Sequence, residues 1–259
     1  MDGDLRRRVV GWLWLVGALG VLVAALAGGG ERELAAYSTS LADRTPNQRH
    51  NATLAARALD GARIAPGGEL SFNRTVGPWV RARDYRLAYV SYGGEMVLAY
   101  GGGVCQTSST LYNAALLAGL EVRERDHHQW APGYVAPGLD AAVAQGIADL
   151  RLVNPYRVPV RVSAGVGDGR LRVRLVARLC PRERCTVTTR TVSASAAPPV
   201  VRYERAVPVD VPAVVRPGRP GCRVVVERLR HRGGRLVRRE PISDDTYLAL
   251  GPLRGVAAR

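Results

Sequence analysis

Lysine is absent from this chain, although its net charge is strongly positive. All 37 basic residues are arginine, and with 22 acidic residues they give a net charge of +15 over 259 residues. Aromatic residues make up only 6% of the chain, and the arginines are spread along it instead of gathering beside aromatics. Nucleic-acid binding relies on basic patches interleaved with stacking side chains, so the sequence argues against a nucleic-acid partner. Anionic lipid or an anionic wall polymer suits this dispersed charge better.

Metal-binding motifs are missing as well. The chain contains no Cys-x2-Cys pair, no His-Glu-x-x-His motif and no carboxylate cluster at ligand spacing, so we expect neither a metal nor another cofactor. Only four cysteines are present. Cys180 and Cys185 enclose four residues, which in an exported chain favours a disulfide, although four cysteines allow three complete pairings. This pairing would leave Cys105 and Cys222 as free thiols.

The N-terminal segment predicts export. Three consecutive arginines, Arg6–Arg8, precede the uncharged run Val9–Ala27, which is long enough to cross a bilayer as a helix. We therefore expect a single-pass anchor in the cell membrane with an extracytoplasmic body. A cleaved signal peptide and a secreted product are the alternative, because Ala25-Leu26-Ala27 has the small-x-small form that signal peptidase accepts.

Composition predicts the organisation of the remaining chain. A polar stretch reads as a tether, an alternating apolar and polar pattern around Val166–Gly169 reads as a β-hairpin, and Ser193–Pro199 has linker composition. The short β-type runs after it predict a small all-β appendage. The expected parts are the anchor (1–30), the tether (31–48), a catalytic domain (49–192), the linker (193–199) and the appendage (200–259).

One thiol, Cys105, stands in an unusual local setting. Gly101–Gly103 precede it and allow a sharp turn with close backbone approach to a ligand, and a helix that ends at Gly119 is expected to follow. A thiol in the first turn of a helix lies near unpaired N–H groups and the positive end of the helix dipole, which favour the thiolate. Cys105 is therefore a candidate nucleophile, and the alternative is a small buried apolar residue. The helical spacing is carried by Leu111, Ala114, Ala115 and Ala118.

This helix, flanked by runs of strand, predicts an α+β fold in which a cysteine-bearing helix packs on a mainly antiparallel sheet. Downstream, His127 and His128 are adjacent, and in an extended segment their rings would point to opposite faces. Parity groups His127 with Arg123 and Arg125 on the solvated side, which leaves His128 to face the thiol. Asp140 either orients a histidine or caps the segment that follows it.

Six segments follow one another along the chain: RHNATLAARALDG, PGGELSFNRTVGP, GGGVCQTSSTLYNAALLAGL, Arg125-x-x-His128, YVAPGLDA and DLRLVNPYRVPV. In this order they resemble the VanW domain of bacterial cell-envelope proteins. The similarity covers about Arg49 to Val162, and the tail resembles, more loosely, the small β-rich domain that often follows a VanW domain. Asp84-Tyr85 departs from the Gly-Tyr of many members near the approach to the site.

The resemblance implies a role in peptidoglycan metabolism linked to glycopeptide resistance. Some members are taken to be L,D-transpeptidases, which join stem peptides through a cysteine nucleophile. On that basis Cys105 is the nucleophile, His128 the general acid and base, and Asp140 the residue that orients His128. The alternative is a non-catalytic envelope protein that binds peptidoglycan or a partner enzyme. Further expected roles are an oxyanion hole from Gly102, Gly103 and Val104, and substrate binding by Gln106, Ser108 and Tyr134.

Overall fold

A computed structural model of the chain describes residues 30–92, 95–204, 213–216 and 218–257. The expected anchor lies outside these residues, apart from Gly30. None of the helices within the described ranges is both long and apolar enough to span a membrane. The fold is α+β, with a few helices and mainly antiparallel sheets, as the sequence predicts.

A four-stranded antiparallel sheet forms one layer of the molecule. The predicted hairpin around residues 166–169 is confirmed, because its two strands pair from Val160↔Ala177 to Gly167↔Arg170, and Asp168 and Gly169 make the turn at positive φ. Apolar side chains on one face of the second strand are buried, while the intervening arginines face outward. The first half of the longer predicted strand, Arg151–Val153, belongs to a different sheet. The sheet order is β1 (Arg32–Ser40), β9 (Arg170–Ala177), β8 (Val160–Gly167) and β2 (Arg63–Ile64).

The segment expected to be a tether is instead the edge strand of this sheet. β1 pairs with β9 from Arg32↔Ala177 to Ser40↔Arg170. Its polar look in the sequence is misleading, because Leu34 and Tyr37 pack against the core and Thr39 is buried. The chain then turns at residues 42–44, and Thr45 caps the next helix with its side chain.

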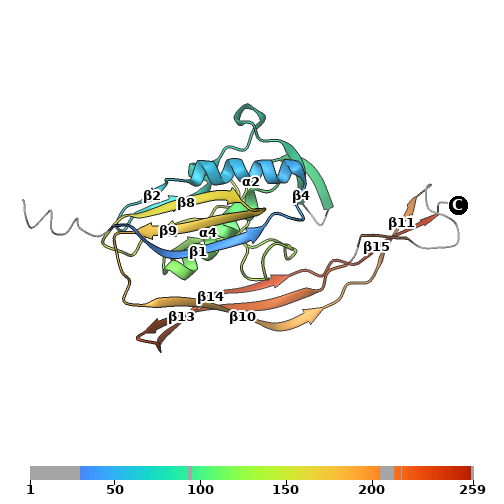
Figure 1. The fold of residues 1–259 in the computed structure, drawn as a ribbon. Coiled ribbons are helices and arrows are strands. Elements are labelled where there is room, and N and C mark those ends of the chain that lie inside the picture. Colours follow the sequence, from blue (N-terminus) through green and yellow to red (C-terminus); the bar gives the residue numbers. More distant parts are fainter. Residues whose placement is uncertain (1–29, 93–94, 205–212, 217, 258–259) are drawn as a thin grey trace, which may run out of the picture.

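Two helices cover the apolar face of the sheet and lie beside each other (Figure 1). Helix α2 (Pro46–Leu59) begins within the expected tether, because Thr45 and Gln48 form a capping box and Pro46 occupies the first turn. Helix α4 (Val104–Ala118) carries Cys105 and ends at Gly119, as predicted. Thirteen of its fifteen residues are buried, so α4 is the central element of the fold.

Smaller elements surround this core. The hairpin of β4 and β5 delivers the chain to the glycine run, and a three-stranded sheet leads into the histidine segment. These elements are β3 (Glu69–Ser71), α3 (Phe72–Val76), the 3-10 helix η1 (Arg81–Arg83), β4 (Leu87–Tyr92), β5 (Glu95–Tyr100), β6 (Glu121–Glu124) and β7 (Arg151–Val153).

The C-terminal part is built from strands, but its boundary differs from the expected one. β10 crosses from the expected catalytic domain into the expected linker, and Ser193–Ser195 are paired to β13. This sheet packs against α4, and the buried Arg228 donates a hydrogen bond of 2.6 Å to the Leu120 carbonyl (Figure 1). The strands are β10 (Arg184–Ser195), β11 (Val200–Glu204), β12 (Ala213–Arg216), β13 (Gly221–Arg232), β14 (Arg235–Tyr247) and β15 (Leu253–Ala257).

The expected disulfide between Cys180 and Cys185 is not formed, and all four thiols are free. Cys185 lies on β10 with its side chain buried beside Gly119, whereas Cys180 is exposed before the strand begins. Sequence spacing alone could not show that strand pairing turns Cys185 toward the core.

Candidate active site

The glycine run places Cys105 by allowing close contact between parts of the chain itself. Gly103 is the N-cap of α4 at φ 108°, and a Cβ there would lie 2.4 Å from the Gln48 carbonyl oxygen of α2. A Cβ on Gly102 would lie 2.8 Å from the Tyr89 carbonyl oxygen of β4. The backbone approach expected toward a ligand is therefore used, at these two residues, for packing against α2 and β4. Cys105 then falls in the first turn of α4.

Cys105 is one of the two α4 residues that are not fully buried. Its Sγ lies 3.5 Å from the Val143 carbonyl oxygen. Burial by itself raises the pKa of the thiol, but its interaction with the positively charged His128 side chain outweighs burial and holds the pKa below the usual value. The site therefore favours a thiolate.

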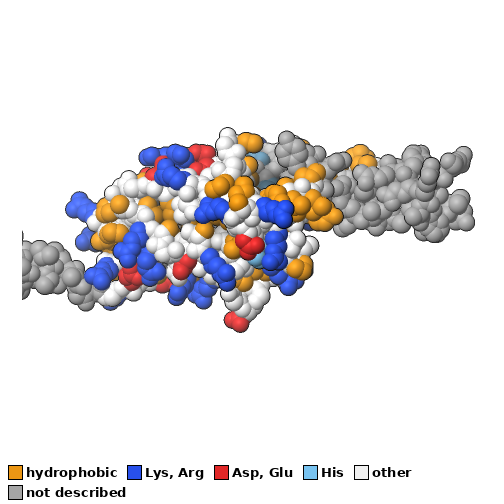
Figure 2. Space-filling view, turned by 90° about the horizontal axis from the view of Figure 1, so that it is seen from above, with side chains coloured by type: hydrophobic (Ala, Val, Ile, Leu, Met, Phe, Trp, Pro, Cys, Tyr) orange, Lys and Arg blue, Asp and Glu red, His pale blue; other side chains and the backbone are white. Residues whose placement is uncertain are grey.

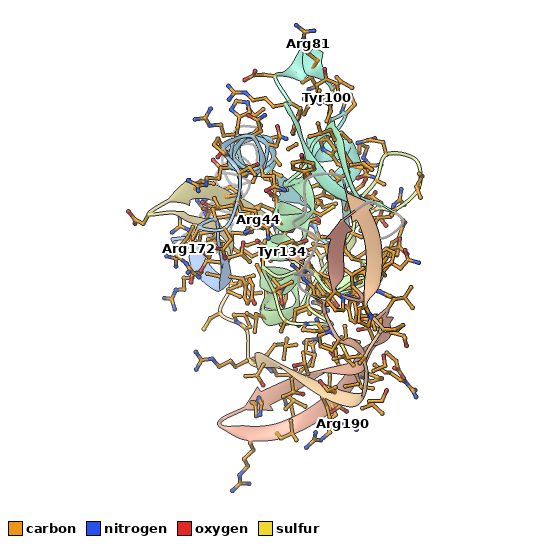
Figure 3. The ribbon with its side chains drawn as sticks, turned by 90° about the vertical axis from the view of Figure 1, so that its right-hand side faces the viewer. Arg44, Arg81, Tyr100, Tyr134, Arg172 and Arg190 are labelled. Atoms are coloured by element: carbon orange, nitrogen blue, oxygen red, sulfur yellow. The ribbon has the colours of Figure 1, made fainter. Side chains whose placement is uncertain are left out.

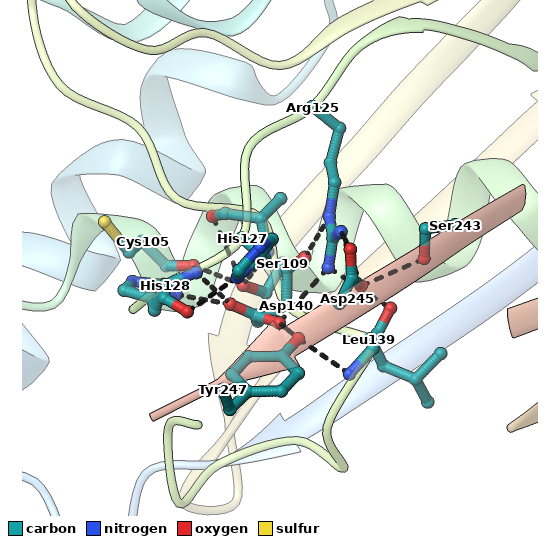
Figure 4. Close-up of polar contacts among 12 residues, drawn as sticks. Cys105, Ser109, Arg125, His127, His128, Leu139, Asp140, Ser243, Asp245 and Tyr247 are labelled. Carbon is teal, nitrogen blue, oxygen red and sulfur yellow. Dashed lines mark hydrogen bonds and ion pairs between the residues drawn. The ribbon is translucent and has the colours of Figure 1, made fainter. Parts of the chain in front are cut away.

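His128 faces Cys105 because two loops are held together behind it. An isolated bridge joins Asp126 to Ala142, and this brings His128 and Asp140 into contact (Figure 4). The Nδ1 atom of His128 lies 2.6 Å from Asp140 Oδ2, and the His128 backbone N–H donates to the same oxygen at 2.7 Å. Since Nδ1 is engaged, Nε2 is the ring nitrogen left to meet the thiol. Burial lowers the pKa of His128, but the bonds to Asp140 and Cys105 raise it from 6.5 to about 10.

Asp140 is fully buried and is held by the C-terminal strand β14 as well as by His128. Tyr247 donates its hydroxyl hydrogen to Oδ1, and Arg125 Nη2 lies 3.2 Å from the same oxygen. Burial raises the pKa of Asp140, but the hydrogen bonds from His128 and Tyr247 lower it below the usual range. No helix begins at Asp140, so the alternative role as a cap is wrong.

Arg125 connects the two parts of the site, and its burial contradicts the sequence-based prediction. Its side chain is only 6% exposed, whereas strand parity placed it on the solvated side. It donates to the Asp140 carbonyl oxygen through Nε at 2.7 Å and pairs with Asp245 through Nη1 at 2.7 Å. Ser243 donates to Asp245 at 2.9 Å and completes this support (Figure 4).

Within the described part of the chain, no contact joins the His127 ring to the Cys105 thiol. Its ring packs against the Tyr247 ring with centroids 5.1 Å apart, and its Nδ1 lies 2.8 Å from the His128 carbonyl oxygen. Tyr247, Arg125 and Asp245 are the site residues that sequence reasoning missed. The Arg125-x-x-His128 spacing offered a signal for Arg125, but nothing local pointed to β14.

Three other expected site residues have structural roles. The Val104 N–H donates to the Gly101 carbonyl oxygen at 2.9 Å, so it is not available to an oxyanion. Gln106 is buried and donates to Thr39 Oγ1 and to the Ser40 carbonyl oxygen, which ties α4 to β1. Ser108 is buried and donates to the Ala141 carbonyl oxygen at 2.7 Å. These contacts leave Gln106 and Ser108 no role as surface contacts to substrate.

Tyr134 remains at the site. Its ring meets the His128 ring edge-on with centroids 6.4 Å apart, and its hydroxyl lies 3.4 Å from Ser109 Oγ. His128 is thus hydrogen-bonded to Asp140 and interacts electrostatically with Cys105, and Tyr134 lies beside it. This arrangement suits nucleophilic catalysis, because a histidine acts on the ionisation of the thiol and a buried carboxylate orients that histidine.

Two curated relatives match part of the chain. The chain is 38% identical to the uncharacterized protein YoaR of Bacillus subtilis (strain 168) over 133 residues, 51% of this chain and 44% of that protein. It is 31% identical to the vancomycin B-type resistance protein VanW of Enterococcus faecalis (strain ATCC 700802 / V583) over 114 residues, 42% of this chain and 41% of that protein. The chain therefore spans less than half the length of each of these relatives.

Two solved structures of G5 domains also match part of the chain. HP0197-G5 has a TM-score of 0.17 and 17% identity and covers 29% of this chain and 99% of its own. The IgA1 protease G5 domain has a TM-score of 0.20 and 14% identity and covers 30% of this chain and 95% of its own. Similarity at these TM-scores carries no inference.

The family described as VanW like protein matches residues 47–176, half of the chain, and on that match the chain belongs to the VanW-like family.

Proposed function

We propose that this chain catalyses acyl transfer between peptidoglycan stem peptides, in the manner of an L,D-transpeptidase with Cys105 as the nucleophile. The observation that carries the proposal is the part-exposed thiol of Cys105, whose pKa is lowered by a histidine that a buried carboxylate holds through Nδ1. The relative named as a vancomycin B-type resistance protein supports a substrate in the cell wall.

The first step forms a thioester. The Cys105 thiolate attacks the carbonyl carbon between the third and fourth residues of a stem, and the C–N bond breaks after protonation of the leaving nitrogen by the His128 imidazolium. A free D-amino acid departs. Asp140 keeps Nδ1 of His128 engaged, so Nε2 points at the reaction throughout.

The second step resolves the thioester. An amine of a neighbouring stem attacks the same carbonyl carbon, the neutral His128 takes the proton of that amine, and the new amide forms as the Cys105 thiolate leaves. The Cys105 N–H in the first turn of α4, with those of Gly102 and Gly103, would stabilise the oxyanion formed in both steps.

Incubation with disaccharide tetrapeptides followed by mass spectrometry tests the proposal. We expect the wild type to release the terminal amino acid, to gain the mass of an acyl adduct and to yield cross-linked dimers. Cys105→Ser should do none of these. Its thermal midpoint should stay within about 2–4 °C of the wild type, the shift for 1 kcal/mol in a protein of this size, because the exchange changes one part-exposed atom.

A larger fall in the midpoint would mean that Cys105 is structural. If the wild type gives neither adduct nor product but binds the tetrapeptide, the chain is a peptidoglycan-binding protein and the catalytic proposal is wrong.

A further inference from the structure

An arginine, Arg44, lies beside the proposed catalytic residues. Arg44 sits between β1 and α2, and its guanidinium carbon lies 4.9 Å from the centre of the Tyr134 ring (Figure 3). Tyr134 in turn contacts the His128 ring. Two ring contacts therefore connect Arg44 to the histidine that holds the thiolate.

Arg44 has no acidic partner within the described part of the chain. Its Nε is buried and donates to no acceptor among the described residues. Asp43 attracts the guanidinium electrostatically but forms no ion pair with it there. The buried arginines Arg125 and Arg228, by contrast, each pair with a carboxylate at 2.7 and 2.6 Å. A partly desolvated guanidinium without a counter-charge lowers the stability of the fold, and a role in ligand binding would explain its presence.

A second guanidinium is close to the first. Arg219 comes from the C-terminal part of the chain and donates through Nη1 to the Ala131 carbonyl oxygen at 3.0 Å, three residues before Tyr134. Burial and the neighbouring charge of Arg219 lower the pKa of Arg44. Figure 2 shows basic side chains scattered over its visible face among fewer acidic ones, so charge alone does not mark a site. What sets Arg44 apart is a buried Nε that has no acceptor among the described residues, in a guanidinium that lies over the Tyr134 ring.

We propose that Arg44, assisted by Arg219, binds a carboxylate of the stem peptide that Cys105 attacks. The inference rests on the proposed function and names a recognition element of the same site. A guanidinium offers parallel N–H donors that match a carboxylate, and the Tyr134 ring fixes its orientation. A tetrapeptide stem presents a terminal carboxylate on the leaving residue and carboxylates on side chains, so the shared chemistry is a carboxylate one or two residues from the scissile bond.

Three synthetic tetrapeptide stems distinguish these sources: the free acid, the form with a C-terminal carboxamide, and the form with a side-chain carboxamide. We expect one amidation to lower kcat/KM of the wild type by about 10- to 100-fold, the scale of a charge-assisted bidentate hydrogen bond. Arg44→Gln should lower kcat/KM for the free acid similarly and abolish the difference between acid and that amide. Arg44→Lys should restore only part of the preference, because lysine is a point charge.

Arg190→Gln is the matched control, since it removes one exposed arginine from the outer part of β10 and should leave the preference intact (Figure 3). If Arg44→Gln does not fold, Arg219→Gln, which alters an exposed side chain, must weaken the preference instead. A wild type that turns over all three stems equally, or a preference that survives loss of Arg44, overturns this inference and leaves the proposed function standing.

If the wild type shows no turnover, the same comparison is made by calorimetric binding in the Cys105→Ser background. Tighter binding of the free acid that depends on Arg44 would then support the carboxylate site while the catalytic proposal fails. Equal binding of the three stems would overturn the carboxylate site.

Discussion

The His128→Ala variant tests the electrostatic basis of the site through the thiol alone, without a substrate. Iodoacetamide reacts with the thiolate, so the labelling rate of Cys105 rises with pH through the pKa of the thiol. In the wild type this pKa lies below its usual value of 9.0, because His128 outweighs the effect of burial. In the variant, burial and the Asp140 charge remain, and both raise the pKa. We therefore expect the labelling curve to move to higher pH, with a midpoint above 9.0.

The size of the effect follows from the fraction of thiolate. A thiol with a pKa of 9.0 is only about 1% ionised at pH 7, and the lowered pKa of Cys105 in the wild type makes its thiolate fraction larger than that. Part of this loss is recovered, because a thiolate of higher pKa is intrinsically more nucleophilic. The labelling rate at pH 7 should therefore fall on the order of tenfold, and the midpoint of the curve is the cleaner readout.

Mass spectrometry of the labelled peptide isolates Cys105 from the other three free thiols. His127→Ala is the control, because its ring contacts Tyr247 and should leave the labelling midpoint of Cys105 unchanged. A shift of the midpoint in His127→Ala together with an unchanged midpoint in His128→Ala would refute the assignment of the base.

Two further variants test how distant parts of the chain support the site. Tyr247→Phe removes a hydrogen-bond donor to Asp140, whose pKa in the folded protein lies below its usual 3.8. The stability that Asp140 contributes is present above pH 3.8 and is lost as the pH falls through the folded pKa. We expect chemical unfolding at several pH values to show that the variant is less stable than the wild type at neutral pH. The loss of this stability on acidification should be complete at a higher pH in the variant than in the wild type. A purely structural tyrosine would lower the stability equally at every pH. Gly103→Ala should lower the thermal midpoint by several degrees, because its Cβ would meet the Gln48 backbone at positive φ, whereas Gly146→Ala, also at positive φ but in open space, should cost less. Equal midpoints for these two alanine variants would contradict the packing account of the glycine run.

Local pattern was enough to predict several parts of this protein. The hairpin of β8 and β9 follows from period-two alternation around a turn, and the end of α4 follows from a glycine that adopts positive φ. Cys105 and His128 were also identified in the sequence, because a thiol after a glycine run and a scarce histidine at the family spacing are local signals. These features depend on neighbours within a few residues.

Burial and long-range partners were decided only by the tertiary structure. The segment predicted as a tether forms β1 by pairing with β9, which lies too far along the chain for local pattern to show. Gln106 and Ser108 are core residues because α4 is covered on nearly every side. Tyr247 reaches Asp140 across 107 residues. The sequence by itself therefore determined which thiol and which histidine are the candidate nucleophile and base, and which elements carry them. Only the packing of β14 against the histidine segment decided what holds His128 in place, since such a contact leaves no periodic or local trace in the chain.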